Sequence, residues 1–178
     1  RDGLFKVPGL GLLMRLIGTV PIYRAMDAAR LSAEDRRAAN AQSLDALASR
    51  VAEGSFSCLF PEGDSHDSPH LLELKTGAAR FYYRARALQA EGSPKPVIIP
   101  VGLHYDAKRA FRSSVLVAFH PPLTLPEFLD APGPAEVLSQ ESLRERCRAL
   151  TGEIDRTLRE VVHATENWEL HHLMHRAR

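Results

Sequence analysis

A short apolar run that passes directly into a polar, glycine-containing loop constrains the fold of this sequence more than any other feature. Phe56–Phe60 has the length and composition of a short buried strand. Pro61 lacks the amide proton that a strand ladder requires, and Gly63 lets the backbone turn. Because α/β sheets place ligand sites at the carboxyl ends of their strands, we predict a site at Phe60–Asp67.

The remaining apolar patterns predict an α/β fold, in which a layered mixed sheet is covered by helices. Its 178 residues suit a single domain over residues 1–178, with residues 139–178 as a C-terminal helical extension. The expected helices are Val7–Ile17, Ser32–Glu53, Thr76–Gln89 and Ser139–Thr165, and the expected strands are Thr19–Tyr23, Phe56–Phe60, Val97–Leu103 and Ser114–Phe119.

The first predicted helix, Val7–Ile17, is almost entirely apolar, with one charge at Arg15. It is either a core helix or a helix that lies in a membrane interface. Its small polar face favours the core interpretation. No run in the chain reaches the roughly twenty apolar residues that cross a bilayer.

Composition excludes wholesale disorder, because 44% of the residues are hydrophobic and 25% are charged. The formal net charge of +1 says little by itself. Two cysteines, Cys58 and Cys147, are too few for a disulfide framework, and we expect both to be reduced core residues. A set of basic residues invites an anionic partner: Arg24, Lys75, Arg80, Arg84, Arg86, Lys108, Arg109 and Arg112.

Three side chains are candidates for a binding site. Glu62 follows a proline and has two open interpretations, namely accepting hydrogen bonds from turn amides or contacting a substrate hydroxyl or a basic side chain. Lys75 lies beside the first amides of the next helix, a combination that suits a phosphate. Arg24, just after a predicted strand, has the bidentate guanidinium that clamps phosphate oxygens.

Other polar residues have simpler interpretations. His66 and Asp67 are adjacent, so we expect a hydrogen-bonded turn rather than a catalytic pair. His66 and His70 lack the carboxylates or thiols that would complete a metal site, and we predict no metal. The three arginines of the following helix are expected on its solvated face: Arg80, Arg84 and Arg86.

The stretch Phe60–Asp67, followed by Leu74–Ala79, resembles the third conserved block of the glycerolipid acyltransferases. The Ser-His-Asp after the glycine is most similar to the branch with the yeast-type glycerol-3-phosphate and dihydroxyacetone-phosphate acyltransferases. Gly18–Arg24 resembles the second block and Val97–Leu103 the fourth, so the resemblance covers about residues 4–125. Three blocks in order are far more specific than one.

This resemblance implies transfer of a fatty acyl group from acyl-CoA or acyl carrier protein to a hydroxyl of glycerol 3-phosphate or lysophosphatidic acid. The acyl thioester is a co-substrate, and no other cofactor is implied. By the same resemblance Arg24 holds the acceptor phosphate, Glu62 and Gly63 build the acceptor pocket, and Pro100 shapes it.

Two departures from the family pattern matter. Ser65 stands where the common family form has an arginine, so phosphate binding falls more heavily on Arg24 and Lys75. The family's catalytic base is a histidine with an aspartate five positions on, and no histidine here has that partner. We therefore expect the catalytic block upstream of Arg1, and an inactive, incomplete domain in this chain by itself.

The expected partners are the acyl donor, the glycerol phosphate or lysophospholipid acceptor, and a membrane surface on its cytoplasmic face, with no nucleic acid. A second hypothesis comes from a different class. A non-catalytic module could bind phosphate or lipid at a membrane surface through Arg24, Lys75 and the apolar first helix.

Overall fold

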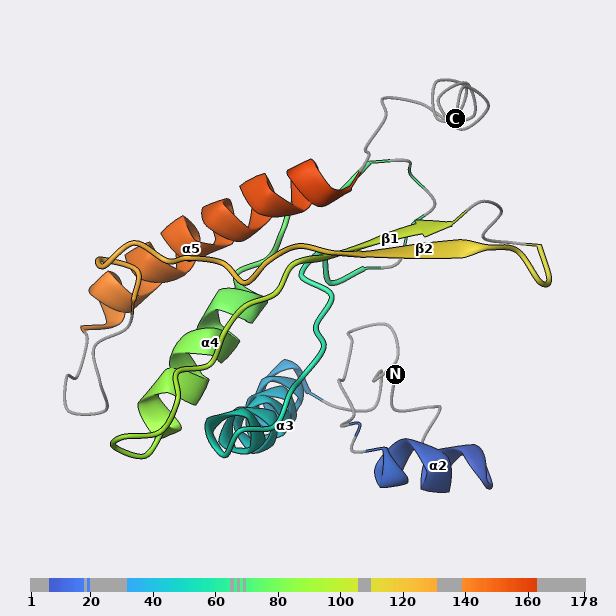
Figure 1. Ribbon diagram of the computed structural model, residues 1–178. Coiled ribbons are helices and arrows are strands. Elements are labelled where there is room, and N and C mark those ends of the chain that lie inside the picture. Colours follow the sequence, from blue (N-terminus) through green and yellow to red (C-terminus); the bar gives the residue numbers. More distant parts are fainter. Residues whose placement is uncertain are drawn as a thin grey trace.

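The computed structural model describes residues 7–17, 19, 32–64, 66, 68, 70–105, 110–130 and 139–162. Helices and a small sheet are both present in this part of the chain, as the predicted α/β class requires (Figure 1). The elements are α2 (Leu10–Leu16), α3 (Ala33–Ala52), α4 (Gly77–Leu88), β1 (Val101–Tyr105), β2 (Val115–Phe119) and α5 (Gln140–Val161).

Local capping signals explain where the two long helices begin. The Ser32 hydroxyl accepts a hydrogen bond from the Asp35 amide, 3.0 Å away, at the start of α3. The Ser139 hydroxyl accepts one from the Ser142 amide at 3.1 Å, at the start of α5. Each serine satisfies an amide that has no partner within the helix. The predicted starts of these helices are therefore confirmed.

The helix α4 is the centre of the core, with α3 on one side and α5 on the other (Figure 1). Phe81 and Ala85 pack against Ala48 of α3. The opposite cluster joins α4 to α5 and includes Leu74, Ala79, Tyr82, Tyr83, Cys147, Leu150, Ile154 and Leu158. Six of the twelve residues of α4 are buried, so only a small part of this helix is exposed.

The two strands form an antiparallel hairpin, with register from Val101 opposite Phe119 to Tyr105 opposite Val115. Pairing continues irregularly before β1, where the Pro100 carbonyl accepts from the His120 amide at 2.9 Å. The predicted strand Val97–Leu103 begins at Val101 instead, because Pro100 has no amide proton to donate. The predicted strand Ser114–Phe119 is confirmed as β2.

Within the described part of the chain, α5 covers one face of the hairpin. The end of α5 lies against β1, where Nε2 of His104 is 3.2 Å from the Val161 carbonyl oxygen. Most of β2 is exposed, including Val115, Leu116 and Val117.

The prediction of a buried strand at Phe56–Phe60 is also wrong. The segment makes no ladder with another described strand, and Phe56 is 96% exposed. Leu59 alone joins the cluster between α3 and α4. An apolar run is buried only where a neighbouring element covers it. Cys58 lies in this uncovered run and is exposed, whereas Cys147 of α5 is buried. The core assignment thus holds for Cys147 and fails for Cys58.

The helix α2 does not bury its apolar side chains. Leu16 is 74% exposed, and Leu12, Leu13 and Ile17 are exposed as well. The preference for a core helix is therefore wrong, since α2 exposes three leucines and is followed by the exposed Ile17. Among the residues that the structure describes, no helix has the length and apolarity to span a membrane.

One arginine of α4 departs from the predicted solvated face. Arg80 and Arg84 are exposed as expected, but Arg86 is buried. Nη1 of Arg86 donates to the Gln89 side-chain oxygen at 2.5 Å, and Nη2 lies 3.5 Å from Asp130. A buried guanidinium is tolerated because these partners compensate for its lost hydration.

Candidate functional site

Backbone hydrogen bonds close the predicted site loop and connect it to the segment before α4. The Gly63 amide donates to the Phe60 carbonyl at 3.1 Å, and the Lys75 amide donates to the Pro61 carbonyl at 2.9 Å. Gly63 has φ of +74°, in the left-handed region that glycine adopts without strain. The two hydrogen bonds hold Glu62 and Gly63 beside the segment that leads into the helix.

Glu62 accepts two hydrogen bonds at the same oxygen. The Leu72 amide donates to Oε2 at 2.8 Å, and Nε2 of His66 lies 2.6 Å from that oxygen. Glu62 thus accepts a backbone amide, as in its first interpretation, but the donor Leu72 lies ten positions along the chain and not in the turn. Contact with a substrate hydroxyl stays a prediction. The sequence did not predict the Glu62–His66 pair. Its only signal was the i, i+4 spacing of the two residues across a turn.

Lys75 lies across Gly63 and pairs with the loop. Its Nζ is 2.8 Å from Oδ2 of Asp64, and both side chains are more than half exposed. A Cβ placed on Gly63 would lie 3.0 Å from Cδ of Lys75. The Lys75 ammonium is thus held over the loop at its solvent side.

The start of α4 favours a negatively charged group. Its N-cap residue, Thr76, makes no side-chain capping bond, and the first turn contains no acidic residue. Helix amide groups at an N-terminus carry partial positive charge, which adds to that of the neighbouring Lys75. This end of α4 is electrostatically suited to an anion.

The structure brings only some of the predicted site residues together. Glu62, Gly63 and Lys75 lie together in the loop. Pro100 is buried and belongs to the hairpin through its carbonyl. Arg24 and Ser65 lie outside the described residues, as does most of the predicted strand Thr19–Tyr23.

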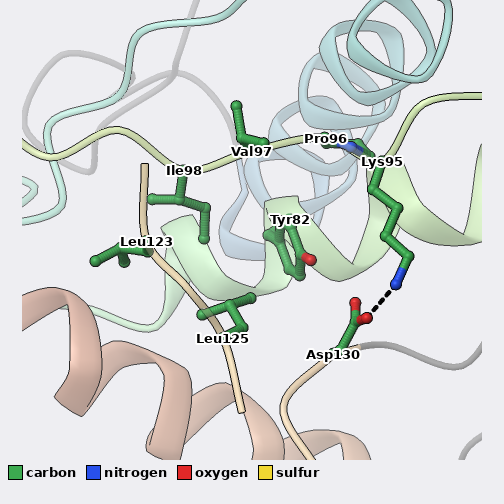
Figure 2. A pocket seen from close by; sticks show the side chains of 8 residues that line it. All are labelled: Tyr82, Lys95, Pro96, Val97, Ile98, Leu123, Leu125 and Asp130. Atoms are coloured by element: carbon green, nitrogen blue, oxygen red, sulfur yellow. Dashed lines mark hydrogen bonds and ion pairs between the residues drawn. The ribbon is translucent and has the colours of Figure 1, made fainter. Parts of the chain in front are cut away.

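A separate pocket of about 160 Å³ lies between α4 and two extended segments (Figure 2). Tyr82 lies between apolar side chains on one side and the Lys95–Asp130 ion pair on the other. Burial, with a smaller contribution from Asp130, raises the pKa of the Tyr82 hydroxyl. The pocket is smaller than the roughly 300–1,000 Å³ of typical ligand sites, and we assign it no ligand. None of the predicted site residues lines it.

Metal ligands are not grouped in the described part of the chain, where no three His, Cys, Asp or Glu side chains are placed to hold an ion. The polar side chains of the loop suit recognition of hydroxyl and anionic groups. Glu62 supplies an acceptor, and Lys75 with the start of α4 supplies positive charge.

Several known proteins resemble part of this chain. It is 39% identical over 67 residues to glycerol-3-phosphate O-acyltransferase 2 of Saccharomyces cerevisiae, a match covering 38% of this chain and 9% of that protein. It is 31% identical over 111 residues to glycerol-3-phosphate O-acyltransferase 1 of the same yeast, covering 62% of this chain and 14% of that protein.

An uncharacterised acyltransferase of Schizosaccharomyces pombe is 29% identical over 106 residues, covering 60% of this chain and 14% of that protein. The chain therefore spans only a small part of the curated relatives that it matches. No solved structure matches it significantly.

The family described as Acyltransferase matches residues 1–104, a span that contains the loop, Lys75 and the start of α4. The predicted family is confirmed by this match and by the yeast relatives, and the assignment of the separate blocks stays a prediction. The chain belongs to the glycerolipid acyltransferase family.

Proposed function

We propose that the protein containing this chain transfers a fatty acyl group from acyl-CoA or acyl carrier protein to a hydroxyl of glycerol 3-phosphate or lysophosphatidic acid. The observation that carries the proposal is the grouping of Glu62, Gly63 and Lys75 at the start of α4. It provides a hydroxyl acceptor and an anion site in one loop. The names of the two yeast relatives support glycerol 3-phosphate as the acceptor.

Each residue has a defined task in this proposal. The Glu62 carboxylate accepts a hydrogen bond from a hydroxyl of the acceptor and orients it. The Lys75 ammonium and the first amides of α4 bind the phosphate, with Arg24 as a bidentate partner. Because Asp64 pairs with Lys75, phosphate binding would draw Lys75 away from that carboxylate.

The acyl transfer itself needs a base that removes the hydroxyl proton as the oxygen attacks the thioester carbonyl. The thiol of the carrier is the leaving group. The family resemblance assigns the base to a histidine with an aspartate five positions on, and this sequence contains no such pair. We propose that the chain by itself is inactive, since a general base typically contributes about a hundred- to ten-thousand-fold.

Peripheral attachment to the cytoplasmic face of a membrane is part of the proposal. Its support is α2, in which Leu12, Leu13 and Leu16 are exposed, as is Ile17 directly after the helix. An amphipathic or apolar helix of this kind can lie in the interface, where lipid acceptors are found.

The direct test expresses the full open reading frame that encodes this chain and offers it glycerol 3-phosphate with acyl-CoA or acyl carrier protein. Acyl transfer is expected, and Glu62→Gln should lower kcat/KM for the acceptor about tenfold or more. Glu73→Gln is the matched control, because Glu73 is exposed in the same loop. Absence of transfer to either acceptor would refute the proposal.

The exposed apolar face of α2 favours a second candidate, a non-catalytic module that binds phosphate or lipid at a membrane surface. Flotation with vesicles containing phosphatidic acid separates the two. Binding without acyl transfer by the full reading frame would support the module. Binding that persists in Lys75→Met would argue against its phosphate site.

A further inference from the structure

The Glu62–His66 pair has a defined hydrogen-bond direction. Nδ1 of His66 accepts a hydrogen bond from the Ser68 amide at 3.1 Å. A ring nitrogen that accepts carries no proton, so the proton of the neutral imidazole is on Nε2. That proton points to Oε2 of Glu62, 2.6 Å away. His66 is therefore a donor to Glu62.

The carboxylate of Glu62 is fixed by two donors on one oxygen. The terminal torsion of a glutamate is broad, so a single hydrogen bond leaves the carboxylate able to rotate. The Leu72 amide, 2.8 Å from Oε2, is the second donor. Both side chains of the pair are mostly buried, with 22% and 20% exposed for His66 and Glu62. Among the described residues, the hydrogen bonds of Glu62 thus use Oε2 and leave Oε1 for another donor.

We propose that His66 is a positioning residue for the acyl acceptor, because it fixes the Glu62 carboxylate so that Oε1 receives the acceptor hydroxyl. This inference rests on the proposed function, in which Glu62 contacts that hydroxyl. His66 itself touches Glu62 and the Ser68 amide and transfers no proton in the reaction.

Two substitutions separate the two hydrogen bonds of His66. In His66→Gln the side-chain amide reaches the position of Nε2 and still donates to Glu62. In His66→Asn the shorter side chain reaches the position of Nδ1 and still accepts from Ser68. His66→Ala loses both bonds.

In the full reading frame, His66→Asn and His66→Ala should raise KM for the acceptor about tenfold, the scale of one hydrogen bond to a charged group. His66→Gln should stay within about threefold of wild type on the same scale. KM for the acyl donor should not change in any of them, which excludes general damage to the fold. His120→Gln is the matched control, because His120 bonds a backbone carbonyl, that of Pro121, rather than a site carboxylate.

Nitrogen NMR of the histidine-labelled protein provides a readout besides activity. The His66 ring should show a protonated Nε2 and an unprotonated Nδ1, and Glu62→Gln should shift the Nε2 resonance. A proton on Nδ1 of the neutral ring would overturn the inference directly.

The kinetic outcomes distinguish two failures. Rescue by His66→Asn but not by His66→Gln, or an unchanged acceptor KM in all three variants, overturns the positioning role while the proposed function stands. Lack of acyl transfer by the wild-type protein refutes the proposed function, and this inference falls with it.

Discussion

The Lys75 side chain lies so close to Gly63 that a Cβ at this glycine would be 3.0 Å from Cδ of Lys75. Gly63 also has φ of +74°, which an L-residue adopts at a cost. Two separate requirements therefore select glycine at this position, one from the backbone and one from the lysine above it.

Gly63→Ala should consequently cost more than a backbone penalty alone. The left-handed conformation costs about 1–2 kcal/mol for a residue with a Cβ. Displacement of Lys75 from Asp64 should add to it and should also weaken glycerol 3-phosphate binding. Urea unfolding and calorimetric binding by the full reading frame measure the two effects.

Gly92→Ala is the matched control, because Gly92 has φ of +79° and a Cβ at this position would meet nothing within 4 Å. It should show the backbone penalty without any loss of binding. Equal effects of both substitutions on binding would show that the Lys75 contact is unimportant.

The two cysteines should differ strongly in reactivity. Cys58 is exposed, whereas Cys147 is buried in the α4–α5 cluster. Burial raises the pKa of the Cys147 thiol, which disfavours the reactive thiolate. A colorimetric thiol reagent should therefore titrate one thiol in the native chain and a second only after unfolding.

Cys58→Ser should remove the fast reaction and Cys147→Ser should leave it unchanged. A fast reaction that survives Cys58→Ser would contradict the burial of Cys147.

Asp130 should contribute far more stability than a comparable surface carboxylate. It lies 3.5 Å from buried Arg86 and also pairs with Lys95. Asp130→Asn leaves the Arg86 charge with weaker compensation, at a cost of about 2–3 kcal/mol. Asp45→Asn is the control: Asp45 pairs with Arg84 at 2.8 Å, but both side chains are half exposed.

Solvent screening limits such a surface pair to about 0–1 kcal/mol. Chemical denaturation of the two variants measures the difference, and equal free energies of unfolding would contradict the buried network.

Tyr83 should make stability fall at high pH. Its hydroxyl donates to the Leu129 carbonyl at 3.0 Å, and burial, as the main cause, raises its pKa from 10.0 to about 12. Between these values the unfolded chain loses the phenolic proton before the folded chain does. The stabilising contribution is therefore intact below pH 10 and is lost as the pH rises toward 12.

Tyr83→Phe should cost about 1 kcal/mol at neutral pH through the lost hydrogen bond. The gap between wild type and variant should narrow above pH 10, which unfolding curves at several pH values would detect. A constant gap would show that the Tyr83 ionisation is not coupled to folding.

Local signals in the sequence predicted the helices well. Ser32 and Ser139 act as caps through amides only three residues away, so their effect needs no knowledge of the rest of the fold.

Features that depend on distant partners could not be predicted. Burial of Arg86 requires Asp130, which is 44 positions away in the sequence. Exposure of Phe56 reflects the absence of a covering strand among the described elements. In the site loop, the residue types indicated Glu62 and Lys75 as binding residues. The contact between His66 and Glu62 depends on the path of the turn, which the residue types do not determine.

The hydrogen bond from the Lys75 amide to the Pro61 carbonyl links the site loop to the best-buried helix of the described chain. Opening of the loop should therefore require partial loss of order at the start of α4, and the Lys75 amide should exchange its hydrogen about as slowly as the core. Substitutions that loosen the α4–α5 interface would then weaken acceptor recognition from a distance, with no change in any residue that meets the substrate.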